Sequence, residues 1–221
     1  MPRAMNRYER QKEASRRQIL DSALATFHEL GYHAANVEDI ITRAKVSRAT
    51  FYKHFKSKLA VAEALMAQLG SRQAEAYDRL SMAEEPDRAA IVAWLDEIIE
   101  INEQNKRLLA VVAESFRSEP RLREAAAIAD TNRIRKLSKS IPAFRGALAT
   151  TIDAPGARER VQILLFEIDT ALFHLSARDW RVDRRIVADF LAGQIENFIA
   201  EASERSRTSL ASSRRRGGQR L

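Results

Sequence analysis

The sequence predicts an all-α protein, with a small N-terminal helical domain followed by a larger helical bundle, about nine helices in all. Apolar residues recur three and four positions apart along most of the chain, and no segment shows a convincing strand alternation. The composition agrees, because the 221 residues are 45% hydrophobic and 30% charged but include only 7 Gly and 5 Pro. Turn residues are too sparse for a protein of many strands.

The N-terminal domain, residues 1–57, is predicted to contain three helices. The first covers residues 12–30 and ends at Gly31, a suitable C-cap. Its apolar stripe comprises Ile19, Leu20, Ala23, Leu24, Phe27 and Leu30. Asn36 and Ser47 are good N-caps for the second and third helices, which are only about two turns long.

Residues 58–202 predict a second, larger helical domain. Ser57 can cap a helix that runs from Lys58 towards Leu80, and Pro86 and Pro120 each mark a further helix start. The helix after Pro120 is expected to stop near Pro142, and another covers residues 108–117. A loop at residues 150–158 precedes two final helices at about 157–178 and 183–202. From residue 203 the chain is rich in Ser, Arg and Gly, which predicts a basic disordered tail, 203–221.

Positive charge is concentrated at the two ends of the chain. Residues 1–58 hold 12 Lys and Arg against 6 Asp and Glu, residues 59–202 hold 19 against 23, and residues 203–221 hold 6 against 1. A basic front beside a mildly acidic body indicates that the front meets a polyanion. The arginines of the tail either add nonspecific attraction to phosphate or are simply solvated.

The segment VSRATFYKHFKSK, residues 46–58, is both aromatic and basic. At about 100° per residue, Phe51 and Phe55 share one face of a helix and can pack on the first two helices. The opposite side then carries Ala49 and Lys53, flanked by Thr50 and Tyr52, with Arg48 at the N-terminal end and His54 and Lys58 on the rim. Cations, hydroxyls and one small residue are what a helix needs to enter the DNA major groove. We therefore expect a helix-turn-helix DNA-binding domain.

The stretch ANVEDIITRAKVSRATFYKHFKSKLAVAEAL, residues 34–65, closely resembles the helix-turn-helix of the TetR family of transcriptional regulators. The resemblance implies backbone contacts from Asn36, Val37, Thr50, Tyr52, His54 and Lys58, and base reading by Arg48 and Ala49, with Tyr52 beside the bases. The family usually has Gly where this chain has Lys45, in a turn that needs positive φ. Lys45 is therefore expected to be slightly strained, at a cost of about 1 kcal/mol, and could contact phosphate.

The last two predicted helices carry more apolar surface than one subunit obviously needs. The helix at residues 157–178 is apolar nearly all round, and the helix at 183–202 repeats apolar residues three and four apart. We expect a homodimer formed through these two helices. A larger core within one subunit is the alternative.

The resemblance also implies an effector-controlled regulator, in this case a repressor that binds a palindromic operator as a homodimer and is released by an unknown small molecule. Candidate effector contacts are Trp94, Phe116, Glu167, Thr170 and His174, since the last three lie on one helical stripe amid apolar neighbours. The alternative for each is a core or interface residue. A constitutive or architectural DNA-binding protein, and a dimeric module that binds RNA or another acidic partner, are alternative functions.

Enzyme, metal and cofactor chemistry are not expected. The chain has no Cys, its four histidines lack metal-ligand spacing, and no phosphate-binding glycine loop or nucleophile-elbow motif is present. The polar N-terminus and the lack of a long apolar run predict a cytoplasmic protein.

Overall fold

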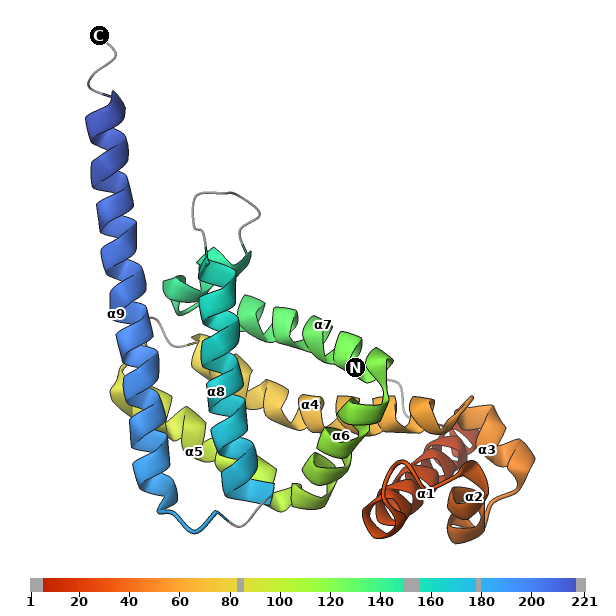
Figure 1. Cartoon of the computed structure of the whole chain (residues 1–221). Helices are drawn as coiled ribbons and strands as arrows, with labels where there is room; N and C mark the ends of the chain where they lie inside the picture. Colours follow the sequence, from red (N-terminus) through yellow and green to blue (C-terminus); the bar gives the residue numbers. More distant parts are fainter. Residues whose placement is uncertain (1–5, 83–85, 149–155, 178–179, 218–221) are drawn as a thin grey trace. The chain divides into compact units, whose positions relative to one another are not determined.

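The computed structural model describes residues 6–82, 86–148, 156–177 and 180–217, and their side chains except those of Ser118, Ala177 and residues 206–217. These ranges contain nine α-helices and one 3-10 helix, and no strand, which confirms the predicted all-α fold (Figure 1). The helices form two compact units, each with its own hydrophobic core. No helix within the described ranges combines the length and apolar character needed to cross a bilayer.

Unit 1 consists of residues up to 72 together with residues 104–128. It contains α1 (Arg7–Leu30), α2 (Val37–Ala44), α3 (Arg48–His54), the first part of α4 (Lys58–Met82), α6 (Lys106–Ser118) and the start of α7 (Pro120–Leu137). Figure 1 shows α1, α2 and α3 gathered around the start of α4. Residues of α6 and α7, namely Leu108, Val111, Val112 and Leu122, share one core with Ile19, Phe27, Ile40 and Phe51.

The caps and turns of α2 and α3 form as the sequence predicts. The Asn36 side chain accepts from the Asp39 N–H at 3.1 Å, and the Asp39 carboxylate accepts from the Asn36 N–H at 2.9 Å, a complete capping box. Lys45 has the left-handed conformation, φ 50° and ψ 41°, which is rare for a residue with a Cβ. Ser47 then caps α3 by accepting from the Thr50 N–H at 3.0 Å.

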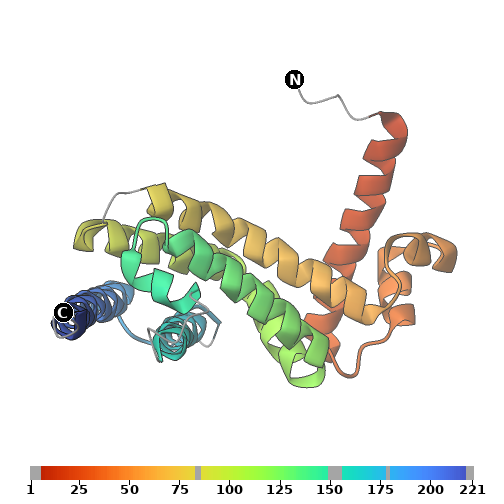
Figure 2. The same ribbon diagram turned by 90° about the horizontal axis from the view of Figure 1, so that it is seen from above.

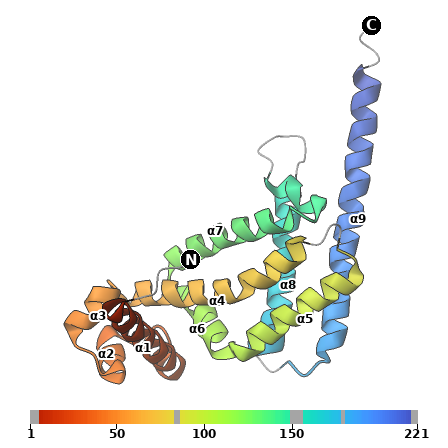
Figure 3. The same ribbon diagram turned by 180° about the vertical axis from the view of Figure 1, so that it is seen from behind.

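Unit 2 consists of residues 73–103 and those from 129 onward. It holds the second part of α4, α5 (Arg88–Gln104), most of α7, the 3-10 helix η1 (Pro142–Leu148), α8 (Ala157–Ala177) and α9 (Arg184–Gly217). Its core includes Ile91, Leu95, Ile99, Val161, Ile168 and Ala188, all nearly inaccessible. Figures 2 and 3 show α8 and α9 running side by side, α9 being the longer.

Three predicted boundaries differ from the structure. The first helix begins at Arg7 rather than 12, because Asn6 and Glu9 form a second capping box that was not recognised. The helix that starts at Pro120 ends at Leu137, and Pro142 opens η1 instead of closing α7. α9 continues as a helix to Gly217, where the sequence predicts a disordered tail from 203. Most of the predicted loop at 150–158 lies outside the described residues.

Candidate nucleic-acid interface

Helix α3 separates its apolar and polar side chains as predicted. Phe51 is 0% exposed and Phe55 4%, and their rings lie 6.1 Å apart within the core of unit 1. Tyr52 is 44% exposed, with its ring edge-on to Phe51 at 5.3 Å, and Ala49 and Lys53 face solvent. The two phenylalanines therefore fix the helix, and the polar side remains open to a partner.

Arg48, at the start of α3, forms a solvent-exposed ion pair that a DNA group could replace. Its guanidinium pairs with the Glu38 carboxylate of α2, and both side chains are more than half exposed. It also lies 5.7 Å from the centre of the Tyr52 ring. An exposed ion pair contributes only about 0.2–1 kcal/mol, so DNA can replace Glu38 at small cost.

Lys53 and His54, at the end of α3, lie beside the N-terminal half of α1. The Lys53 ammonium donates to the Tyr8 hydroxyl at 3.0 Å, and this contact lowers the pKa of Tyr8. Partial burial, then the nearby charges of Lys12, Lys53 and Arg16, lower the pKa of His54. The end of the helix thus belongs to a cluster of cations.

Lys58, at the start of α4, has an internal role that the sequence did not reveal. Its ammonium donates to the carbonyl oxygens of Tyr32 at 2.8 Å, His33 at 3.2 Å and Ala35 at 2.8 Å, which occupies its three donors. It also lies 4.6 Å from the centre of the Tyr32 ring. Lys58 therefore ties the connection between α1 and α2 to α4, and its predicted phosphate contact stays a prediction.

Tyr32 extends this connection to α6. Its N–H donates to Glu114 at 2.9 Å and its hydroxyl donates to Glu119 at 2.8 Å. Burial, then the hydrogen bond to Glu119, raises the pKa of the Tyr32 hydroxyl. Gly31 beside it has φ +80°, and a Cβ there would meet the Glu114 carboxylate at 3.1 Å, so this position favours glycine.

The other predicted DNA contacts lie on the same unit. Lys45 is exposed in the turn between α2 and α3, and Asn36 is exposed at the start of α2. Val37 and Thr50 are half-buried, and the Thr50 hydroxyl lies 2.8 Å from that of Ser47. All ten predicted DNA contacts thus belong to α2, α3 and the segments that flank them.

Residues 19–65 match the sequence model of a family described as bacterial regulatory proteins, tetR family. The matched segment covers the helix-turn-helix geometry described above. Residues 19–65 are therefore a segment typical of the TetR family. This is a family of transcriptional regulators and not of enzymes, in agreement with the expectation from the sequence.

Curated relatives match only part of this chain. The A-factor receptor protein of Streptomyces griseus is 44% identical over 50 residues, which are 23% of this chain and 18% of that protein. The HTH-type transcriptional activator FasR of Mycolicibacterium smegmatis is 35% identical over 102 residues, 44% of this chain and 46% of that protein. The chain therefore spans less than half the length of these relatives.

Solved structures of the TetR family share the fold over most of the chain. A TetR-family regulator from Syntrophomonas wolfei has a TM-score of 0.64 at 16% identity, covering 85% of this chain and 96% of that chain. FadR from Bacillus subtilis, solved in complex with stearoyl-CoA, has a TM-score of 0.59 at 18% identity, covering 80% and 95%. At these identities the likeness extends to the fold alone.

In unit 2, three of the five predicted effector contacts lie together. Glu167, Thr170 and His174 line one open groove on α8 with Phe166, Ala171 and Trp180. Trp94 lies elsewhere, in the core of unit 2, where its ring meets Tyr77 edge-on at 5.2 Å. Phe116 belongs to unit 1 and packs against its core.

The surface of α8 and α9 carries the surplus of apolar residues that the sequence indicates. Six large side chains are between 41% and 70% exposed; we refer to them as the apolar face: Ile163, Phe166, Trp180, Val182, Ile186 and Phe190. They are not absorbed into the core of unit 2. The alternative of a larger core within one subunit therefore does not account for these residues.

Sequence analysis missed Tyr8 and Tyr32, which position Lys53 and Lys58. A signal existed for the first of them, because the Asn6-Arg7-Tyr8-Glu9 pattern is a capping box that starts α1 early enough to include Tyr8. No local pattern indicates Tyr32, because its partners Glu114 and Glu119 lie more than 80 residues away in sequence.

Proposed function

We propose that this chain is a sequence-specific DNA-binding transcriptional regulator, a repressor that binds a palindromic operator as a homodimer and is released by a small-molecule effector. The observation that supports DNA binding most is the division of α3. Phe51 and the adjoining Phe55 are buried, whereas Arg48, Tyr52 and Lys53 are exposed. Arg48 and Ala49 read bases, while Thr50, Tyr52, Lys53 and His54 contact the backbone.

The second helix and the flanking turns complete the interface. Asn36 and Val37 open α2, and the positive end of the helix dipole there favours an anion. Lys45, exposed in the strained turn, adds a phosphate contact. Lys58 reaches a phosphate only by giving up part of its bonding to the three carbonyls, so its contribution is smaller than that of Lys45.

Dimerisation follows from the apolar face of α8 and α9. A monomer that exposes six large apolar side chains between residues 163 and 190 carries a cost in water. A two-fold pairing of this face with its copy buries them, and the two α3 helices must then lie about 34–36 Å apart to meet successive major grooves.

The effector of this proposal binds in unit 2, where Glu167, Thr170 and His174 line the groove on α8. A carboxylate, a hydroxyl and an imidazole offer hydrogen bonds, and through Phe166 and Trp180 the groove borders the proposed dimer interface. Trp94 and Phe116 line no part of this groove and serve packing in this proposal. Release requires that the effector favour a state of the dimer whose α3 spacing does not fit the operator.

Selection of bound duplexes from a random pool, repeated with candidate metabolites, tests this proposal. We expect enrichment of a palindrome with half-sites about 10 base pairs apart, and lower occupancy when the effector is present. Enrichment that no metabolite changes indicates a constitutive binder. Equal recovery of all duplexes contradicts sequence-specific regulation. A reporter driven from the selected operator then distinguishes repression from activation.

A further inference from the structure

One side of the N-terminal half of α1 brings cations next to the end of α3. Tyr8, Lys12 and Arg16 lie four residues apart, so they form one stripe along the helix. Tyr8 accepts a hydrogen bond from Lys53, and the Arg16 guanidinium lies 5.2 Å from the centre of the Phe55 ring. Both ends of the stripe therefore touch α3 or the residue that follows it.

The charges of this stripe are not neutralised within unit 1. Among the described residues of unit 1, the ion pairs are Arg43 with Glu29 and Arg48 with Glu38, and neither involves Lys12, Arg16 or Lys53. The pKa of His54 is lowered by Lys12, Lys53 and Arg16 and raised by Glu13, which places three cations and one carboxylate around that ring. Like charges held together weaken a fold, so the cluster needs an anion.

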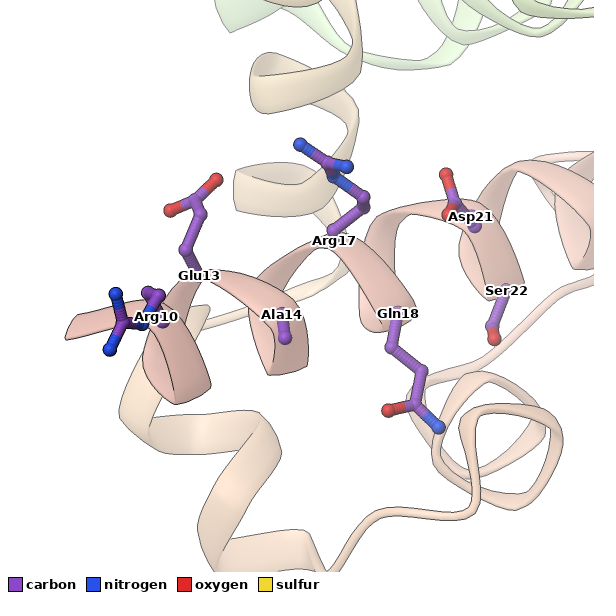
Figure 4. Close-up of a pocket in the computed structure, with 7 residues that line it drawn as sticks. All are labelled: Arg10, Glu13, Ala14, Arg17, Gln18, Asp21 and Ser22. Atoms are coloured by element: carbon purple, nitrogen blue, oxygen red, sulfur yellow. The ribbon is translucent and has the colours of Figure 1, made fainter. Parts of the chain in front are cut away.

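A neighbouring side of the same helix has a different pattern. Arg10, Glu13, Arg17 and Asp21 line a shallow groove and alternate in sign along α1 (Figure 4). Figure 4 shows Glu13, Arg17 and Asp21 projecting on one side and Gln18 on another, where the Gln18 amide donates to the Ala44 carbonyl at 2.7 Å. This side is balanced in charge, and the stripe towards α3 is not.

We propose that Lys12 and Arg16 of α1, with Lys53 held by Tyr8, form a phosphate-binding surface that grips the DNA backbone on the flank of the half-site read by α3. This inference rests on the proposed function and adds a contact outside the helix-turn-helix. Tyr8 fixes the Lys53 ammonium before DNA arrives, which reduces the entropy lost on binding. Arg16 keeps its planar group on Phe55 and presents its N–H groups to phosphate.

The test is a titration of the full-length protein with the selected operator and with a scrambled duplex over a range of salt concentrations. The double variant Lys12→Gln, Arg16→Gln keeps good helix formers on α1. We expect the slope of log K against log salt to fall in magnitude by about 1.8, since each phosphate contact contributes about 0.9. The fall is the same on both duplexes, because the contacts do not read bases.

The matched control is Arg10→Gln, Arg17→Gln, which removes the same number of charges from the balanced side and should leave the slope nearly unchanged. Shortening the duplex on either side of the half-sites should lower the DNA affinity of the wild-type protein and leave the affinity of the Lys12 and Arg16 variant almost unaltered. A wild-type slope in that variant, or equal slope changes in both double variants, overturns the inference. Failure of the wild-type protein to prefer any duplex sequence instead refutes the proposed function.

Discussion

The two units differ in how many buried polar atoms lack hydrogen bonds and in how many apolar side chains are exposed. Among the described side chains of unit 2, five buried polar atoms have no hydrogen-bond partner: Trp94 Nε1, Asp96 Oδ1, Arg133 Nε, Ser140 Oγ and Ser176 Oγ. No described side chain of unit 1 has such an atom. Unit 2 also exposes the apolar face of six residues, whereas unit 1 exposes Tyr8 and Leu30 at opposite ends of α1, Tyr52 on α3 and Ile128 on α7.

This difference is what we expect if a partner completes unit 2 and unit 1 needs none. A buried polar atom without a partner costs about 1–3 kcal/mol, and natural proteins retain such costs chiefly where function requires them. Arg133 is an example. Its two terminal nitrogens donate to Asp169 at 2.7 and 2.8 Å and to Tyr77 at 3.2 Å, while its buried Nε finds no partner among the described residues. Burial raises the pKa of Tyr77 to about 12, so its hydroxyl stays neutral. Under our proposal, a second subunit and an effector complete unit 2.

The largest effect is expected from charges placed on the apolar face. Phe166→Asp with Phe190→Asp buries two carboxylates in the proposed interface, and the desolvation cost separates the subunits. Sedimentation should show a mass near 25.0 kDa for this variant and twice that mass for the wild-type protein. Ile128→Asp, at an exposed apolar residue of unit 1, serves as the control and should remain dimeric. A wild-type monomer at micromolar concentration contradicts the proposed dimer.

The next effect tests whether unit 1 depends on the buried side of α3. Phe51→Ala removes a ring that is 0% exposed, and the resulting cavity should lower the free energy of unfolding by about 3–5 kcal/mol. Chemical denaturation followed by circular dichroism measures the loss. Tyr52→Ala, one residue along, should keep nearly the full stability and weaken DNA binding. A stable Phe51→Ala protein is incompatible with this packing.

A smaller effect is expected at Lys58. Lys58→Met keeps the apolar stem but removes the ammonium from three carbonyl oxygens, which should lower the free energy of unfolding by about 2 kcal/mol. The salt dependence of DNA binding, measured on the same variant, distinguishes the two roles. A slope that falls by about 0.9 with no loss of stability favours the phosphate contact over the internal one.

The smallest effect is a pH dependence through His54. Because burial and the charges of Lys12, Lys53 and Arg16 lower its pKa in the folded state, the unfolded chain binds the proton more tightly, and stability falls as pH drops below about 6.5. Bound phosphate opposes those charges and raises the pKa, so DNA binding takes up a proton. Operator affinity should rise less than tenfold from pH 7.5 to 5.5, and His54→Asn should remove that rise. If the operator affinity of the wild-type protein instead falls in acid, and His54→Asn removes that fall, the proposed contact of His54 with phosphate is contradicted.

In unit 1, the sequence predicts the helices and their caps far better than the hydrogen bonds between distant segments. The caps at Asn36 and Ser47, and the helix side that carries Phe51, follow from local patterns of residues within four positions. The strained turn at Lys45 follows from the resemblance to the TetR helix-turn-helix. The bonds of Lys58 and Tyr32 follow from neither, since their partners are 23 to 87 residues away. The shared core of α6 with α1 to α3 was hidden for the same reason.

Unit 2 was less predictable because its helices lack a single apolar side. The composition of α8 indicated that the helix is apolar nearly all round, and the structure buries Leu164, Leu165 and Ile168 while exposing Ile163 and Phe166. Which side faces the core depends on neighbours far away in sequence. Helical spacing nevertheless predicts that Glu167, Thr170 and His174 lie on one side of α8, and all three line the same groove, whereas no spacing links them to Trp94 or Phe116.

The base-reading role of α3 is the central claim, and the affinity of Arg48→Ala for single-substitution variants of the selected operator tests it most directly. The account predicts a loss of about 1–3 kcal/mol confined to the base pair that Arg48 reads, with the variant indifferent to substitution there. An equal loss on every operator variant and on scrambled duplex would instead make Arg48 a backbone contact and contradict base reading by this residue.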